Sequence, residues 1–141
     1  MTGWLRATVA GTALIFVSGC ALFGDSTLGT LVTFEQLTGF DHPIQAAELS
    51  ADQEPQDVFS ELRDEDLPAL PPLGEQTRRF AFIDSGCAHN SARLVIEEGE
   101  LTAQLLEDGS PEQQTDCGGL AWFLSVFDVP IDDLPDPVRL P

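Results

Sequence analysis

The second half of the chain alternates apolar and polar residues with the period of two that β-strands require. This alternation predicts strands at 79–84, 92–97 and 100–106. The dipeptide Glu98-Gly99 separates the last two strands, and its glycine accepts the positive φ of a tight turn. We therefore expect these two strands to form an antiparallel hairpin.

Residues 120–129, with the sequence LAWFLSVFDV, form the most hydrophobic segment after the N-terminal region. Large apolar residues occupy both alternating faces, which is typical of a central strand that is covered on both sides. Pro130 is expected to end this strand, because proline has no backbone N–H to donate. A further strand is predicted at 30–34, where β-branched and aromatic residues cluster.

Residues 48–74 have a different composition, because acidic residues and prolines replace most of the large apolar ones. Val58, Phe59 and Leu62 have the spacing of one face of a short helix. The remainder carries too little apolar surface to offset the entropy lost on ordering. We therefore predict an acidic, partly flexible insert with at most a short helix.

Strands joined by short turns, with little helix, predict a mainly β fold, a small antiparallel β sandwich or an open barrel. The chain has 141 residues, which fits one domain, and the strands assign that domain to 28–141.

The charge of the chain is strongly negative, with 24 acidic residues against 6 arginines and no lysine. So few basic residues cannot form the positive face that nucleic acid requires. The same charge opposes contact of the folded domain with anionic lipid. We expect neither nucleic-acid binding nor a membrane-surface role for the domain itself.

The N-terminal region has the order of an export signal. Arg6 is followed by an uncharged, hydrophobic stretch over 7–19. The end of this stretch, together with the next residue, reads Val17-Ser18-Gly19-Cys20. This run resembles the bacterial lipobox, in which an aliphatic and two small residues precede a cysteine. The resemblance implies cleavage after residue 19, a lipidated tether over 20–27 and a diacylglyceryl group on Cys20. The alternatives are an ordinary cleaved signal peptide and an uncleaved signal anchor, for which the uncharged residues 7–24 are barely long enough.

The lipobox resemblance implies a protein held on the extracytoplasmic face of a cell membrane by the lipid on Cys20. The segment FAFIDSGC, followed by a hairpin and a second cysteine before a hydrophobic strand, is similar to small uncharacterised lipoproteins of high-G+C Gram-positive bacteria. This second resemblance implies no functional residues.

Two cysteines, Cys87 and Cys117, remain after Cys20 is assigned to lipid. Because exported proteins meet an oxidising compartment, we expect these two to form a disulfide. The alternative is a metal site that also uses His89, although paired C-x-x-C spacing and a fourth ligand are missing. The bond would join the turns beside strands 79–84 and 120–129, so these strands should be neighbours or face each other.

No arrangement of residues along the sequence identifies a reaction. His89 lies near Asp84, Ser85 and Ser91, but a histidine in a turn is usually exposed, and closeness in sequence does not make a triad. We therefore expect a non-enzymatic envelope module without a cofactor, which binds a ligand or an envelope protein.

The alternative function is an anchored hydrolase with its site near His89. A cleft that held His89 together with a buried carboxylate and a serine would favour it. The acidic groups at 64–66 and 132–136 also raise the question of calcium binding through oxygen ligands.

Overall fold

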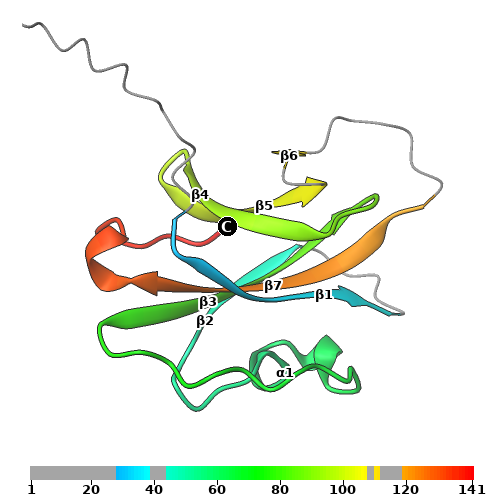
Figure 1. The fold of residues 1–141 in the computed structure, drawn as a ribbon, viewed down its shortest axis with the longest axis horizontal. Helices are drawn as coiled ribbons and strands as arrows, with labels where there is room; N and C mark the ends of the chain where they lie inside the picture. The colour runs from blue at the N-terminus through cyan, green and yellow to red at the C-terminus, as the bar shows by residue number, and fades with distance from the viewer. Residues whose placement is uncertain (1–27, 39–43, 108–109, 112–118) are drawn as a thin grey trace, which may run out of the picture.

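The computed structural model describes residues 28–38, 44–107, 110–111 and 119–141. The expected leader, the tether with Cys20, and Cys117 lie outside the described residues. Within them the chain forms two antiparallel sheets that face each other, and no closed barrel (Figure 1). The predicted mainly β, antiparallel fold is confirmed.

The two sheets differ in size. The large sheet has the order β1-β7-β3-β2, and the small sheet has the order β4-β5-β6. The large sheet contains β1 (Thr30–Leu37), β2 (Gln45–Leu49), β3 (Thr77–Gly86) and β7 (Ala121–Pro130). The small sheet contains β4 (Ser91–Glu97), β5 (Glu100–Glu107) and the two-residue β6 (Ser110–Pro111).

The hairpin of β4 and β5 turns at the predicted dipeptide. Glu98 has φ 52° and Gly99 has φ 85°, and Glu97 pairs with Glu100 directly beside them. Positive φ at both central residues gives the backbone twist that matches two paired strands. The prediction of this hairpin is confirmed.

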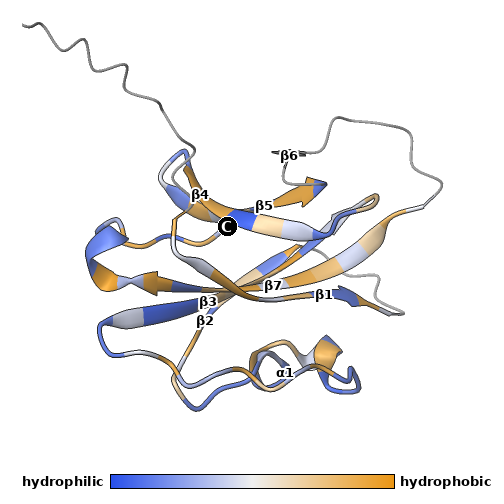
Figure 2. Cartoon of the chain, viewed as in Figure 1, coloured by the Kyte–Doolittle hydropathy of each residue, from blue (hydrophilic) through white to orange (hydrophobic). Residues whose placement is uncertain are grey.

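Strand β7 is central in the large sheet and buried on both faces, as its sequence predicts. On the face toward the small sheet, Phe127 and Val129 pack with residues of β4 and β5 in one apolar cluster. On the opposite face, Leu124 and Val126 belong to a second cluster. Hydrophobic residues dominate β7 in Figure 2, which agrees with its burial.

The opposite face of the large sheet is covered by the segment that was expected to be a partly flexible insert. The segment contains α1 (Pro55–Val58) and η1 (Ser60–Leu62). Phe59 and Leu62 are buried against the large sheet, whereas Val58 points outward. Leu67 and Leu70, later in the same segment, also pack against the second cluster, so this part of the segment lies on the sheet as a layer.

The chain after β7 returns to the small sheet. A short helical turn, η2 (Ile131–Asp133), leads into an extended tail, and the backbone N–H of Leu101 donates to the carbonyl oxygen of Arg139 at 2.8 Å. Val138 and Leu140 pack against the cluster between the sheets. In the part of the chain that the structure describes, no helix has the length and apolarity to cross a membrane.

Candidate functional site

A row of three side chains crosses the large sheet near the end of β3. Phe123 on β7 is the register partner of Gln36 on β1 and of Asp84 on β3. Register partners in antiparallel strands project to the same face of a sheet. All three therefore face the small sheet, as do Phe80 and Phe82, which precede Asp84 at alternate positions of β3.

His89 lies in the connection from β3 to β4, where the chain passes from the large sheet to the small one. Its ring meets Phe123 edge to face, with centroids 5.4 Å apart and an interplanar angle of 81°. A methyl group on Gly86 would overlap Nε2 of His89 and would lie 3.1 Å from Cδ1 of Leu105. Only glycine leaves room for the imidazole at this place.

The structure corrects two expectations about this segment. Strand β3 does not end before Ser85 but continues through Gly86. His89 is not an exposed turn residue, because it is partly buried and both of its ring nitrogens are buried. The physical reason is the missing side chain at Gly86, which lets the imidazole enter the gap between the sheets.

Asp84 is a buried carboxyl group beside this histidine-containing connection. Its Oδ2 atom is buried and accepts no hydrogen bond from the residues that the structure describes. Burial raises the pKa of Asp84 to about 6, because a charged carboxylate loses its hydration there. The strand alternation already contained the signal, since Asp84 shares its parity with Phe80 and Phe82.

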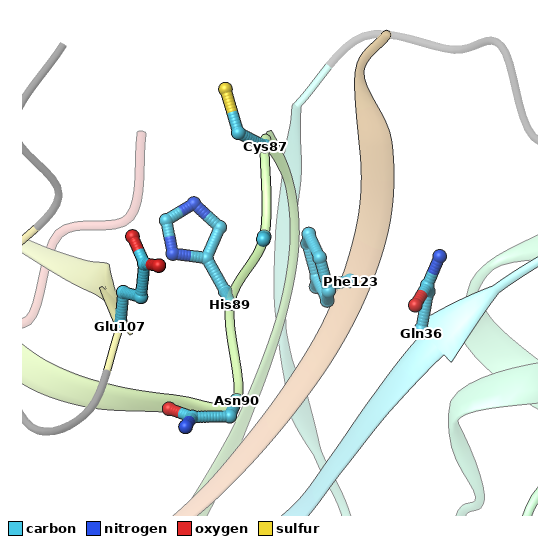
Figure 3. A pocket seen from close by; sticks show the side chains of 7 residues that line it. Gln36, Cys87, His89, Asn90, Glu107 and Phe123 are labelled. Carbon is cyan, nitrogen blue, oxygen red and sulfur yellow. The ribbon is translucent and has the colours of Figure 1, made fainter. Parts of the chain in front are cut away.

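A cavity of about 440 Å³ opens at this end of the sandwich. The side chains that line it come from both sheets and from the connection between them (Figure 3). They are Gln36, Cys87, Ala88, His89, Asn90, Glu107 and Phe123. In Figure 3 His89 lies between Glu107, which belongs to β5, and Phe123, which belongs to β7.

The lining combines polar side chains with an aromatic surface. Glu107 is exposed and supplies a carboxylate, Gln36 and Asn90 supply amide groups, and Phe123 supplies apolar surface. None of the described residues that line the cavity is an arginine. The lining can therefore accept several hydrogen bonds and carries negative formal charge.

Cys87, at the edge of the cavity, is disulfide-bonded. Its partner lies outside the described residues, so the pairing with Cys117 stays a prediction. Gly86 and Ala121 are register partners, so β3 and β7 are hydrogen-bonded neighbours, as the expected bond requires. The alternative metal site loses Cys87 as a thiolate ligand.

The described residues also contain no group of three or more histidine, cysteine, aspartate or glutamate side chains that could hold a metal ion. The acidic residues at 64–66 and 132–136 belong to this described part. Of these, Glu65 accepts hydrogen bonds from the backbone N–H and the hydroxyl of Thr38.

The structure brings His89 and the buried carboxyl of Asp84 to one end of the sandwich but adds no serine to the cavity lining. Ser85 alternates to the opposite face of β3. Ser125 shares the face of Phe123, but it is fully buried and its Oγ is out of reach of solvent. The hydrolase alternative required a cleft that holds His89, a buried carboxylate and a serine, and the serine is missing from the described lining.

The chain matches no protein-family model, no curated protein and no solved structure. Inference about function therefore depends on the residues and the geometry of this chain.

Proposed function

We propose that the chain is a lipid-anchored binding module on the extracytoplasmic face of a membrane, and that it holds a small polar ligand in the cavity beside His89. The observation that carries this proposal is the cavity itself, which joins hydrogen-bonding side chains to an aromatic surface at the end of the sandwich. Ligand sites of proteins commonly combine these two kinds of surface.

The way in which the lining is held supports the proposal. Gln36, Glu107 and Phe123 extend from three strands, so the hydrogen-bonded sheets fix their backbones. His89 and Asn90 belong to a short connection between sheets, and the disulfide at Cys87 restrains its start. Rigid strands that carry a variable loop are a frequent arrangement in binding proteins.

The anchor part of the proposal is supported by the lipobox-like run that ends at Cys20. The lipid would hold the chain at the membrane, and the acidic domain would be repelled by anionic headgroups. Residues 20–27 would span at most about 28 Å if fully extended. That reach lets the domain stand clear of the headgroups with its cavity open to the envelope space.

One observation favours a second candidate, an anchored hydrolase. Asp84 has a pKa raised to about 6 by burial and lies near His89, as an acid or base in catalysis often does. If the chain hydrolysed a generic ester, the His89→Ala variant should lose that turnover while keeping its fold. Hydrolysis with this dependence would replace the binding proposal.

Backbone amide chemical shifts of the ¹⁵N-labelled domain test the binding proposal. A mixture of small cationic, neutral and anionic fragments should shift the amides of Gln36, residues 87–90, Glu107 and Phe123. The far end of the hairpin, where Glu97, Glu98, Glu100 and Thr102 line a separate hollow, is the internal control. Shifts confined to that control, or no shifts at all, would contradict the proposal.

A further inference from the structure

Two carboxyl groups project toward the space between the sheets at the end of the sandwich where the cavity opens. Asp84 projects from the large sheet toward the small one, in register with Phe123. Glu107 shares the parity of Leu101 and Leu105 on β5, and these leucines pack toward the large sheet. Glu107 lines the cavity, whereas Asp84 does not line it but is the register partner of Phe123, which does.

Neither of these carboxyl groups forms an ion pair with an arginine of the described residues. Arg78 forms an ion pair with Glu48, and Arg79 forms one with Asp128, each with a shortest N–O distance of 2.6 Å. Arg93 donates to Oε1 of Gln104 at 2.7 Å. These arginines are engaged elsewhere, and the chain as a whole has a net charge of −18.

Four parts of the fold contribute described side chains to the cavity next to Asp84. The connection contributes His89, β5 contributes Glu107, and β1 and β7 contribute Gln36 and Phe123. Among these four side chains, those of His89 and Glu107 are ionisable. A ligand with a negative charge would meet the carboxylate of Glu107, whereas a ligand with a positive charge would gain it as a partner.

We propose that the cavity binds a small organic cation, an ammonium or guanidinium group on an apolar body. The cationic group lies against Glu107, and the apolar body lies against Phe123. This inference rests on the proposed function, because it names the ligand class of the same cavity. Hydrogen bonds from a cationic donor to a carboxylate are about twice as strong as neutral ones, and the amide oxygens of Gln36 and Asn90 are further acceptors.

Because of the buried carboxyl group of Asp84, binding of a cation should be accompanied by proton release. Burial raises the pKa of Asp84 to about 6, so part of the unliganded protein is protonated there near that pH. A cation in the neighbouring cavity favours the ionised form of Asp84 and lowers its pKa. Binding should therefore release protons near pH 6, and affinity should rise as the pH increases from 5 to 7.

Calorimetric titration with three matched probes tests the ligand class. Benzylammonium, benzyl alcohol and benzoate share a ring and differ in charge. At pH 7 we expect benzylammonium to bind at least about tenfold more tightly than either of the others. Glu107→Gln should weaken benzylammonium about tenfold, and Glu98→Gln, at the far end of the hairpin, should leave its affinity unchanged.

A second titration, in two buffers of different ionisation enthalpy near pH 6, tests the role of Asp84. The wild-type domain should release protons on binding benzylammonium, and Asp84→Asn should release fewer. The variant comparison is needed because His89 also lies beside the site. Equal proton release in both proteins would show that the bound cation does not change the ionisation of Asp84.

The results with the three probes distinguish a failure of the inference on ligand charge from a failure of the proposed ligand site. If benzyl alcohol or benzoate shifts the cavity amides and benzylammonium does not, the cavity is a ligand site and the inference on charge is overturned. If Glu98→Gln weakens benzylammonium as much as Glu107→Gln does, the cation binds the acidic surface in general, and the inference also fails. If none of the probes shifts the cavity amides, both are contradicted.

Discussion

Asp84 links the stability of the domain to pH at the scale of a single residue. Its pKa is about 6 in the folded protein and 3.8 for the unperturbed group. Because the folded value is raised, the protonated group favours folding below pH 4, and this contribution is lost as the pH rises through 6. The difference of about two pKa units corresponds to about 3 kcal/mol.

The variant Asp84→Asn removes this titration. At pH 7 we expect it to be more stable than the wild type by about 2–3 kcal/mol, and the advantage should vanish near pH 4. Urea unfolding at a series of pH values measures the difference. A stability difference that stays constant between pH 4 and pH 7 would show that folding does not raise the pKa of Asp84.

The sequence contained part of the information about this residue. Strand alternation places Asp84 on the same face as Phe80 and Phe82, so its inward direction could be predicted. The position of His89 could not, because it depends on the path of residues 87–90 between two sheets and on the space above Gly86. Phe123, which supplies the aromatic contact, comes from a strand more than thirty positions later.

At the scale of the element, Phe59 and Leu62 anchor the segment that covers the outer face of the large sheet. Both are buried against the large sheet, and the backbone N–H of Leu62 donates to the carbonyl oxygen of Phe59 at 3.0 Å. The composition of this segment predicted flexibility, since acidic residues and prolines dominate it. Composition averages over the segment, whereas packing depends on the few residues that enter the core.

Two neighbouring substitutions test the packed layer. Phe59→Ala removes a buried ring and should lower the free energy of unfolding by about 3–4 kcal/mol. Val58→Ala changes the adjacent, outward side chain and should change it by less than about 1 kcal/mol. Chemical denaturation of both variants gives the comparison. Equal, small effects would mean that the segment does not pack on the sheet in solution.

Strand β2 shows where element prediction failed. Its sequence, Gln45–Leu49, contains alanine, glutamine and glutamate and no β-branched residue, so it carries no local strand signal. It forms because the edge of β3 offers backbone partners and Leu49 enters the core. In contrast, β4, β5 and β7 have strong alternation or high apolarity, and their predictions were confirmed to within a few residues.

The expected Cys87–Cys117 bond belongs to the scale of the whole molecule. Peptide mapping without reductant should recover residues 87 and 117 in one cross-linked fragment. The Cys117→Ser variant should lose roughly 3–4 kcal/mol of stability, because a loop of about 30 residues is no longer closed in the unfolded chain. Recovery of Cys87 in a fragment linked to Cys20 would contradict both the pairing and the lipid assignment.

Anchoring is tested by the intact mass of protein extracted from membranes. We expect a chain that begins at Cys20 and carries the mass of a diacylglyceryl group. In the Cys20→Ala variant the lipid mass should be absent and the leader should remain uncleaved by the lipoprotein peptidase. A mature chain that begins at Ala21, or one that retains Met1 without lipid, would refute the anchor.

The measurement that tests the proposed function most directly is a set of intermolecular nuclear Overhauser effects between the domain and bound benzylammonium. If the cavity is the ligand site, contacts should connect the probe to the ring protons of Phe123 and His89. These two rings lie in contact at the end of the sandwich. Contacts to the hairpin residues Glu98 and Thr102 alone, from benzylammonium and equally from benzyl alcohol and benzoate at saturating concentration, would contradict a ligand site beside His89.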